Sequence, residues 1–179
     1  NYFEIKKKEL DNITYQTNRL NKLGKLEFRL AENNKEKLNV LNFIIQNKSK
    51  QYDDTSAWNL FNEKIYKDFF ISSCLSLDKT SYLSYLKLND EILAAHSGYI
   101  YRNICYYLFP AYNKKYTKYS PGKILLKKII DDSKLNGLDY FDLTIGSENY
   151  KKKYSNYKFY SSLFFKPITS KGYFYIFFF

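Results

Sequence analysis

The pattern of apolar positions in the first 70 residues is mostly helical. Residues 4–23, 34–48 and 55–70 each carry apolar side chains three or four positions apart, a spacing that places them on one face of an α-helix. Between the first two segments, residues 25–31 alternate apolar and charged side chains, and this period of two predicts a β-strand with one buried face. The first helix is predicted to end at Gly24.

From residue 80 onward, β-branched and aromatic side chains dominate. The segments 81–88, 92–101 and 104–111 are separated by short polar turns, and they predict consecutive antiparallel strands. Pro110 has no N–H group for a strand ladder, so the third of these strands must bulge, fray or lie open near its end.

The clearest helix of the chain follows these strands. Ser120 is suited to cap it, Pro121 to begin it and Gly137 to end it, with apolar residues at helical spacing between them. The last part of the sequence predicts a strand at 140–145, a short helix at 148–153 and strands at 159–166 and 172–179.

This order of elements predicts an α/β (α+β) fold with a mixed, mostly antiparallel sheet. A helix between two strands makes a crossover, so the strand 140–145 must run parallel to 104–111 as a central pair, with helices on both faces of the sheet. We expect residues 1–23 to form a helical lead-in and residues 24–179 to form one domain, in keeping with a chain of 179 residues.

The composition restricts the function classes. A net charge of +11 favours an anionic partner, but only three of the 29 basic residues are arginine, and the abundant Lys, Asn, Ile, Tyr and Phe all have A/T-rich codons. Mutational bias therefore explains most of the lysine excess, and nucleic-acid binding is the less favoured interpretation. No apolar run approaches the roughly 18 to 20 residues that span a bilayer.

The two cysteines indicate a compartment. Cys74 and Cys105 have neither a disulfide-scaffold nor a metal-site spacing, which favours buried thiols in a reducing, cytoplasmic environment. The first residue is Asn1 and not Met, so we expect the chain to be part of a longer protein.

The start of the long helix is the strongest candidate for a binding site. Unpaired N–H groups and the positive end of the helix dipole would lie at Ser120, Gly122, Lys123 and Ile124, and the missing Cβ of Gly122 lets a pyrophosphate approach. Lys123 would add positive charge. The alternative is that Ser-Pro-Gly is only good helix-start chemistry.

Several segments together are similar to one family. S-P-G-x-x-L-L from Ser120, followed by G-x-x-x-F-D-x-x-x-G-x-x-x-Y-K from Gly137 to Lys151, resembles the CelD/BcsL-like branch of the GNAT N-acetyltransferases over about residues 19–155. The chain departs from the wider superfamily's Q/R-x-x-G-x-G/A loop, because it has one Gly, and Thr117 or Tyr119 where Gln or Arg would stand.

The resemblance implies an acyl-CoA-dependent N-acyltransferase with acetyl-CoA or another acyl-CoA as co-substrate and no metal. An amine, from an amino sugar or a cell-envelope precursor, would attack the thioester where the two parallel strands part, without a covalent acyl-enzyme. Backbone groups of Phe109 and Ala111 would pair with the pantetheine arm and polarise the carbonyl.

The resemblance also suggests catalytic residues. Tyr150 is the candidate general acid for the leaving thiolate, and His96, the only histidine, is the candidate base. Asp142 would orient Tyr150 or anchor the amine, whereas Lys151 and Tyr112 would contact substrate. The alternatives are a structural Tyr150 and a His96 that belongs to the core.

Two other functions stay open from the sequence. An enzyme of the same fold that uses aminoacyl-tRNA, as in the related FemABX enzymes, would make the basic surface functional. A non-catalytic basic module that binds RNA or an anionic membrane surface would leave the helix start purely structural. The sequence does not indicate an oligomeric state.

Overall fold

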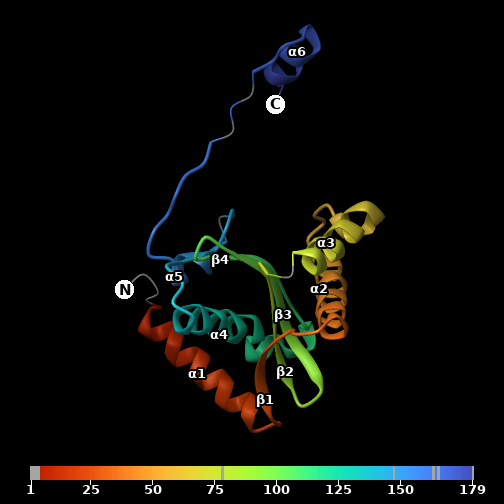
Figure 1. The fold of residues 1–179 in the computed structure, drawn as a ribbon. Helices are drawn as coiled ribbons and strands as arrows, with labels where there is room; N and C mark the ends of the chain where they lie inside the picture. The colour runs from red at the N-terminus through yellow and green to blue at the C-terminus, as the bar shows by residue number, and fades with distance from the viewer. Residues whose placement is uncertain (1–4, 78, 147, 163, 165, 179) are drawn as a thin grey trace.

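The computed structural model describes residues 5–77, 79–146, 148–162, 164 and 166–178 (Figure 1). The strands are β1 (Leu26–Leu30), β2 (Ser81–Leu88), β3 (Glu91–Tyr101), β4 (Ile104–Tyr112) and β5 (Tyr140–Asp142). The helices are α1 (Lys7–Asn21), α2 (Asn34–Asp54), α3 (Lys64–Ser76), α4 (Pro121–Leu135), α5 (Lys151–Tyr154) and α6 (Ser170–Phe178), with 3₁₀ turns η1 (Leu60–Asn62) and η2 (Lys114–Tyr119).

The five strands form one sheet in the order β1-β2-β3-β4-β5. All neighbours are antiparallel except β4 and β5, which are parallel because α4 carries the chain back to the start of β4. The predicted mixed sheet with a parallel pair is therefore confirmed.

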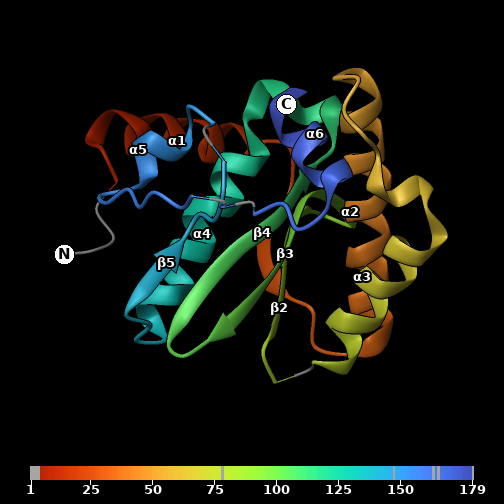
Figure 2. The ribbon, with the colours of Figure 1, turned by 90° about the horizontal axis from the view of Figure 1, so that it is seen from above.

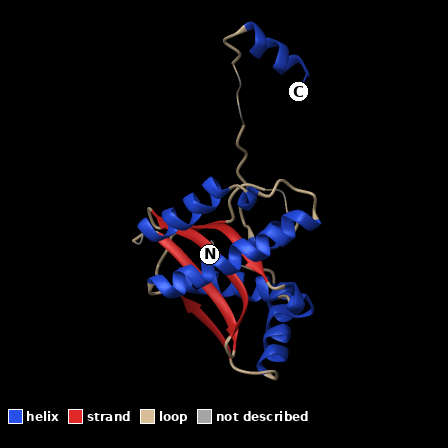
Figure 3. Ribbon diagram, turned by 90° about the vertical axis from the view of Figure 1, so that its right-hand side faces the viewer, coloured by secondary structure: helices blue, strands red, loops and turns tan. Residues whose placement is uncertain are grey.

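Helices cover both faces of the sheet, as expected (Figures 1 and 3). On one face, α1 and α4 build a core cluster that includes Leu20, Leu125 and Ile129. On the other face, α2 and α3 build a second cluster around Leu41, Ile44 and Phe70. The helix α1 is packed into the first cluster, because Leu20 is fully buried there.

A β-bulge divides β4 between the two cores. The register with β3 shifts between Ser97 and Gly98, which leaves Leu108 without a cross-strand partner. Side chains alternate between the faces of a strand, so one extra residue reverses the alternation. Consequently Cys105 and Tyr107 pack in the α1/α4 cluster, whereas Ala111 packs in the α2/α3 cluster.

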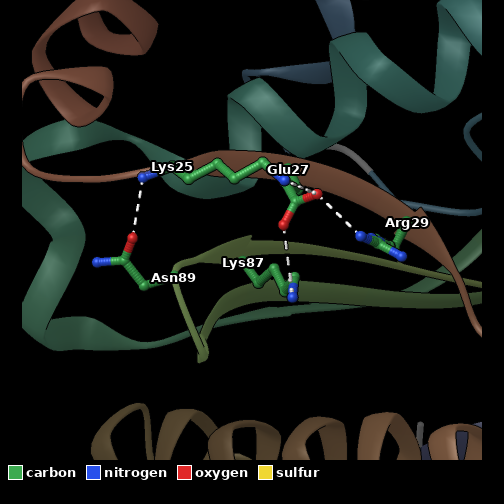
Figure 4. A network of polar contacts seen from close by, with 5 residues as sticks. All are labelled: Lys25, Glu27, Arg29, Lys87 and Asn89. Carbon is green, nitrogen blue, oxygen red and sulfur yellow. Dashed lines mark hydrogen bonds and ion pairs between the residues drawn. The ribbon is translucent and has the colours of Figure 1, made fainter.

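The strand β1 lies at one edge of the sheet and carries a network of charges (Figure 4). The Glu27 carboxylate lies 3.1 Å from Lys25 Nζ, 2.8 Å from Arg29 and 3.5 Å from Lys87. Hydrogen bonds from Arg29 and Lys25 lower the pKa of Glu27 to about 2. Asn89 accepts the Lys25 N–H at 2.9 Å. Charged side chains on an edge strand discourage pairing with another chain.

The helix predicted for residues 55–70 is partly wrong. Thr55 ends α2, and the Asn59 side chain accepts the Phe61 N–H at 3.1 Å, so the chain makes η1 before α3 begins at Lys64. Local hydrogen bonds from Asn compete in this way with a continuous helix. The last core strand is also shorter than predicted, since β5 ends at Asp142.

The strands predicted at 159–166 and 172–179 are wrong for the residues that the structure describes. Residues 155–162, 164 and 166–169 form neither helix nor strand, and α6 follows as a helix of nine residues (Figures 1 and 2). Residues 163, 165 and 179 lie outside the described part of the chain. The period of a short apolar run does not distinguish a strand from a helix. Among the described residues, no strand pairs with the segment after α5.

Candidate active site

The parallel strands β4 and β5 stop pairing at Tyr106 and Asp142, a point that we call the parting. Beyond it, β4 stays paired with β3 as far as Tyr112. The chain after β5 turns at Thr144, whose backbone has φ of 60° and whose N–H donates to Asp142 Oδ1 at 2.6 Å. The Thr144 hydroxyl donates to the Tyr107 carbonyl at 3.2 Å. The two strands therefore separate at Tyr106, four residues earlier than Pro110, near which the sequence suggested that the strand opens.

The backbone beyond the parting has a definite direction. The Asn113 N–H donates to the Leu93 carbonyl at 2.9 Å, so Asn113 faces β3. Because backbone groups alternate in direction along an antiparallel strand, Ala111 and Phe109 also face β3. Their N–H groups are therefore turned away from the parting, contrary to the sequence-based expectation. The Phe109 ring is turned toward Phe70, 5.0 Å away between centroids.

Three other positions of β4 face the parting or have no partner. Pro110 and Tyr112 alternate with Phe109 and Ala111, so their backbone groups face the parting instead of β3. Pro110 has no N–H group to offer there. Leu108 is the extra residue of the bulge. The N–H groups of Leu108 and Tyr112 are consequently the candidates for binding a donor substrate along β4.

The start of α4 follows directly from β4 and η2. Ser120 adopts the left-handed conformation with φ of 52° and ψ of 48°. Its carbonyl accepts the N–H of Lys123 at 3.0 Å and of Ile124 at 3.3 Å, so these two predicted donors are already used. Among the described residues, the Gly122 N–H has no acceptor.

Gly122 also leaves space at the helix start. A Cβ at this position would lie 3.5 Å from Tyr112 Cδ1, an ordinary contact, so packing does not require glycine. The bare Cα and the free N–H therefore form an open position beside the end of β4, which is the geometry that a phosphate group needs.

The charge expected from Lys123 is not free. Lys123 Nζ lies 2.7 Å from the buried carboxylate of Glu9 in α1, which Lys153 and the Tyr154 hydroxyl also contact at 3.3 Å. Burial raises the pKa of Glu9, but hydrogen bonds and charges from the two lysines outweigh burial and lower the pKa overall. Glu9 thereby ties α1 to α4 and α5.

Arg19 and Lys118 bring positive charge to the same region. Arg19 Nη1 donates to the Lys118 carbonyl at 3.4 Å, and its guanidinium lies 4.7 Å from the centre of the Tyr119 ring. The Lys118 ammonium lies 5.1 Å from the same ring. Sequence reasoning missed Arg19, because 99 positions separate it from Lys118. The one feature of the sequence that could have drawn attention to Arg19 is the rarity of arginine, since the chain contains only three.

His96 lies fully inside the core. Its ring stacks on Tyr107 with centroids 4.5 Å apart, and neither ring nitrogen has a hydrogen-bond partner among the described residues. Burial lowers its pKa to about 3. Gly98 makes room for it, since a Cβ there would lie 2.6 Å from His96 Cε1. The geometry favours the structural interpretation of His96 over the base.

Tyr150 immediately precedes α5 and is half-buried against the α1/α4 cluster. Burial, and secondarily the charge of Glu148, raise its pKa to about 12. The phenol consequently keeps its proton at neutral pH. Its hydroxyl has no hydrogen-bond partner among the described residues. Burial, and secondarily Tyr150, raises the pKa of Tyr107.

Neither Asp142 nor Lys151 forms a hydrogen bond with Tyr150 among the contacts of the described residues. Asp142 accepts the Thr144 N–H and so shapes the turn after β5. Lys151 Nζ donates to the Ile145 carbonyl at 2.7 Å and pairs with Glu148 at 3.0 Å, which closes the same turn. Both side chains therefore hold the segment between β5 and α5.

These features define a class. A bulged strand that parts from its parallel neighbour, next to a helix start with a free N–H, is the arrangement in which the family resemblance places the donor. A family profile described as "Acetyltransferase (GNAT) domain" matches residues 7–152. The chain therefore belongs to the GNAT acetyltransferases, in the CelD/BcsL-like family, and is an N-acetyltransferase.

Solved structures share the fold. A possible acetyltransferase from Clostridium difficile 630 has a TM-score of 0.58 at 14% identity, covering 79% of this chain and 99% of that one. FemX has a TM-score of 0.56 at 10% identity, and the match covers 76% of this chain and 47% of FemX. An aminoglycoside acetyltransferase from an uncultured soil metagenomic sample, in complex with sisomicin, has a TM-score of 0.53 at 10% identity. The match covers 80% of this chain and 97% of that one. No curated protein matched the sequence.

In the described part of the chain, no helix is long and apolar enough to cross a membrane. No group of His, Cys, Asp and Glu side chains there has the arrangement of a metal site.

Proposed function

We propose that this acetyltransferase binds acyl-CoA along β4 with its pyrophosphate at Gly122, and transfers the acyl group to a small-molecule amine in the cytoplasm. The observation that carries the proposal is the free N–H and bare Cα of Gly122, placed against Tyr112 at the end of β4. We also propose that one domain extends from α1 to α5, since Glu9 connects α1 with both α4 and α5.

The charge around the helix start supports the donor site. The helix dipole and the Gly122 N–H favour an anion, and Arg19 and Lys118 contact the Tyr119 ring just before Ser120. Arg19 would supply from α1 the positive charge that the loop lacks at Thr117. Lys123 contributes less, because Glu9 already balances it.

The neutral amine attacks the thioester carbonyl carbon, and the carbon–sulfur bond breaks. The nitrogen loses one proton to solvent as the amide forms, and the CoA thiolate takes up a proton from the Tyr150 hydroxyl, which solvent then reprotonates. The N–H of Leu108, the residue that the bulge leaves without a register partner on β3, would stabilise the developing oxyanion. Tyr150 would donate its proton to the leaving sulfur, since its phenol is protonated at neutral pH.

The proton on the attacking amine takes a different route from the one first expected. His96 is buried with a pKa of about 3, so it does not serve this step in the proposal. The ammonium would instead lose its proton to solvent before attack. The pH dependence of turnover then follows the pKa of the acceptor amine itself.

For the acceptor, we propose an amino sugar or a related cell-envelope precursor. This assignment extends the family resemblance, and an aminoglycoside bound to a protein of similar fold supports an amino-sugar amine. A second candidate donor is aminoacyl-tRNA, which the FemABX resemblance implies and which the fold similarity to FemX supports.

The test measures donor binding and turnover together. Acetyl-CoA is titrated into the protein by calorimetry, and thiol release is followed with a panel of amino sugars and other primary amines. Saturable acetyl-CoA binding with amine-dependent thiol release supports the proposal. Absence of acetyl-CoA binding, together with salt-dependent binding of aminoacyl-tRNA, would replace it with the second candidate.

A further inference from the structure

Residues 155–178, which we call the tail, leave the domain after α5. They run away from the sheet and its helices and end in α6, far from the other elements (Figure 1). The family match stops before them, at residue 152. The tail is therefore a part of this chain that the acetyltransferase fold does not explain.

The tail exposes apolar side chains in an unusual way. Phe159, Tyr160, Phe164 and Ile168 have relative exposures of 92%, 83%, 94% and 88%. Single apolar residues scattered over a surface are normal, whereas several large exposed ones along one segment mark an interaction site. These side chains have no core to join in their own domain.

The charge of the tail is one-sided. No Asp or Glu occurs after Glu148, whereas six lysines do: Lys151, Lys152, Lys153, Lys158, Lys166 and Lys171. Three of these lysines lie within the tail, between its aromatic residues. A segment that combines aromatic side chains with lysine and contains no acid is suited to a surface that is both apolar and anionic.

We propose that the tail binds the surface of an anionic lipid bilayer. Tyr and Phe side chains enter the boundary between headgroups and acyl chains, while the lysines contact the anionic headgroups. With nine residues, α6 is about 14 Å long, too short for a hydrocarbon core of about 30 Å, so it lies on the bilayer and does not cross it.

Charge and sequence favour lipid over two other partners. A second copy of the chain is a poor partner, because the tail is basic and the whole chain carries a net charge of +11. RNA is also a poorer match, since the run Tyr173 to Phe178 contains no cation to pair with a phosphate. A bilayer accepts an uncharged aromatic run.

The tail has the length to work as a tether. Residues 155–169, drawn out fully, span at most about 50 Å. The domain would thus remain off the bilayer, with the parting and Gly122 open to solvent, while α6 is bound.

The experiment compares vesicle binding by three forms of the full chain. The first is the unchanged protein. The second is Lys158→Gln/Lys166→Gln/Lys171→Gln, which removes three charges from the tail. The third is Lys22→Gln/Lys35→Gln/Lys128→Gln, which removes three exposed charges from the domain and so matches the second in net charge. Each is sedimented with vesicles of phosphatidylcholine alone and of phosphatidylcholine mixed with phosphatidylglycerol.

We expect the unchanged protein and the domain variant to bind the mixed vesicles. Each lysine near an anionic surface strengthens partitioning about fivefold, so the tail variant should bind roughly 100-fold more weakly. A variant with Phe159→Ser and Phe164→Ser should also lose binding, since both rings are almost fully exposed and neither supports the fold.

Three outcomes would overturn the proposal. One is no sedimentation of the unchanged protein with mixed vesicles. Another is equal weakening by the tail and domain variants, which would indicate general charge attraction. The third is RNA binding or self-association that depends on the tail lysines in a protein that ignores vesicles.

Discussion

Replacing Gly122 separates the role of the helix start in binding from its role in folding. Gly122→Ala places a methyl group 3.5 Å from Tyr112 Cδ1, which is an ordinary contact. Alanine is also favoured over glycine in a helix by about 0.5–1 kcal/mol. The variant should therefore be as stable as the unchanged protein or slightly more stable.

Acetyl-CoA affinity should change in the opposite direction. The Gly122 N–H is the one donor of this helix start, among the described residues, that has no acceptor. A hydrogen bond to a charged group contributes about 1.5–3 kcal/mol, and blocking it corresponds to a Kd roughly 10- to 150-fold higher. Gly122→Val, with two more methyl groups in the approach path, should reach the upper part of this range.

The assay combines calorimetric titration of acetyl-CoA with thermal unfolding. Gly137→Ala is the matched control, because Gly137 has φ of 69° at the far end of α4 and nothing within 4 Å of its Cβ position. It should lose stability through backbone strain and keep its acetyl-CoA affinity. A folded Gly122→Val protein that binds acetyl-CoA as tightly as the unchanged protein would refute the reasoning.

Three other predictions concern single residues. Tyr150→Phe should lower kcat about 10²- to 10⁴-fold without changing the melting temperature, and full turnover would show that the hydroxyl has no catalytic role. The buried, neutral ring of His96 has a pKa of about 3 when folded and 6.5 when unfolded. Its contribution to stability is therefore complete above pH 6.5 and falls by about 1.4 kcal/mol per pH unit as the pH drops toward 3. Urea unfolding of His96→Leu across this range should lack that dependence, and an unchanged slope would contradict the assignment. Glu9→Gln should destabilise the fold by about 1–3 kcal/mol, measured by urea unfolding, because Lys123 and Lys153 lose their buried partner. An unchanged urea midpoint would show that Glu9 does not hold α1 in place.

The elements with strong periodicity were predictable from the sequence. β2, β3 and β4 lie within one residue of their predicted bounds, because alternating side chains on both faces of the sheet join real cores. The start of α4 at Pro121 follows from the fixed φ of proline at a first helical position. Parallel pairing of β4 and β5 followed from the crossover alone.

Elements and roles that depend on distant partners were not predictable. Lys123 is read from the sequence as a free charge, but Glu9, from a helix 114 positions earlier, neutralises it. The direction of the Phe109 and Ala111 backbone depends on the bulge at Leu108. Pro110 indicated a bulge, fraying or opening near the end of this strand, but not which residue would be the extra one. The aromatic alternation in the tail predicted strands, although the described residues contain no strand that pairs with this segment.

Binding of acyl-CoA along β4, with its pyrophosphate at the start of α4, can be followed residue by residue through the amide resonances of the ¹⁵N-labelled protein during titration with acetyl-CoA. We expect the largest shifts at the N–H groups of Gly122, Leu108 and Tyr112, with smaller shifts at Phe109 and Ala111, which face β3. Saturable binding that leaves Gly122 and Leu108 unshifted would contradict this mode of binding.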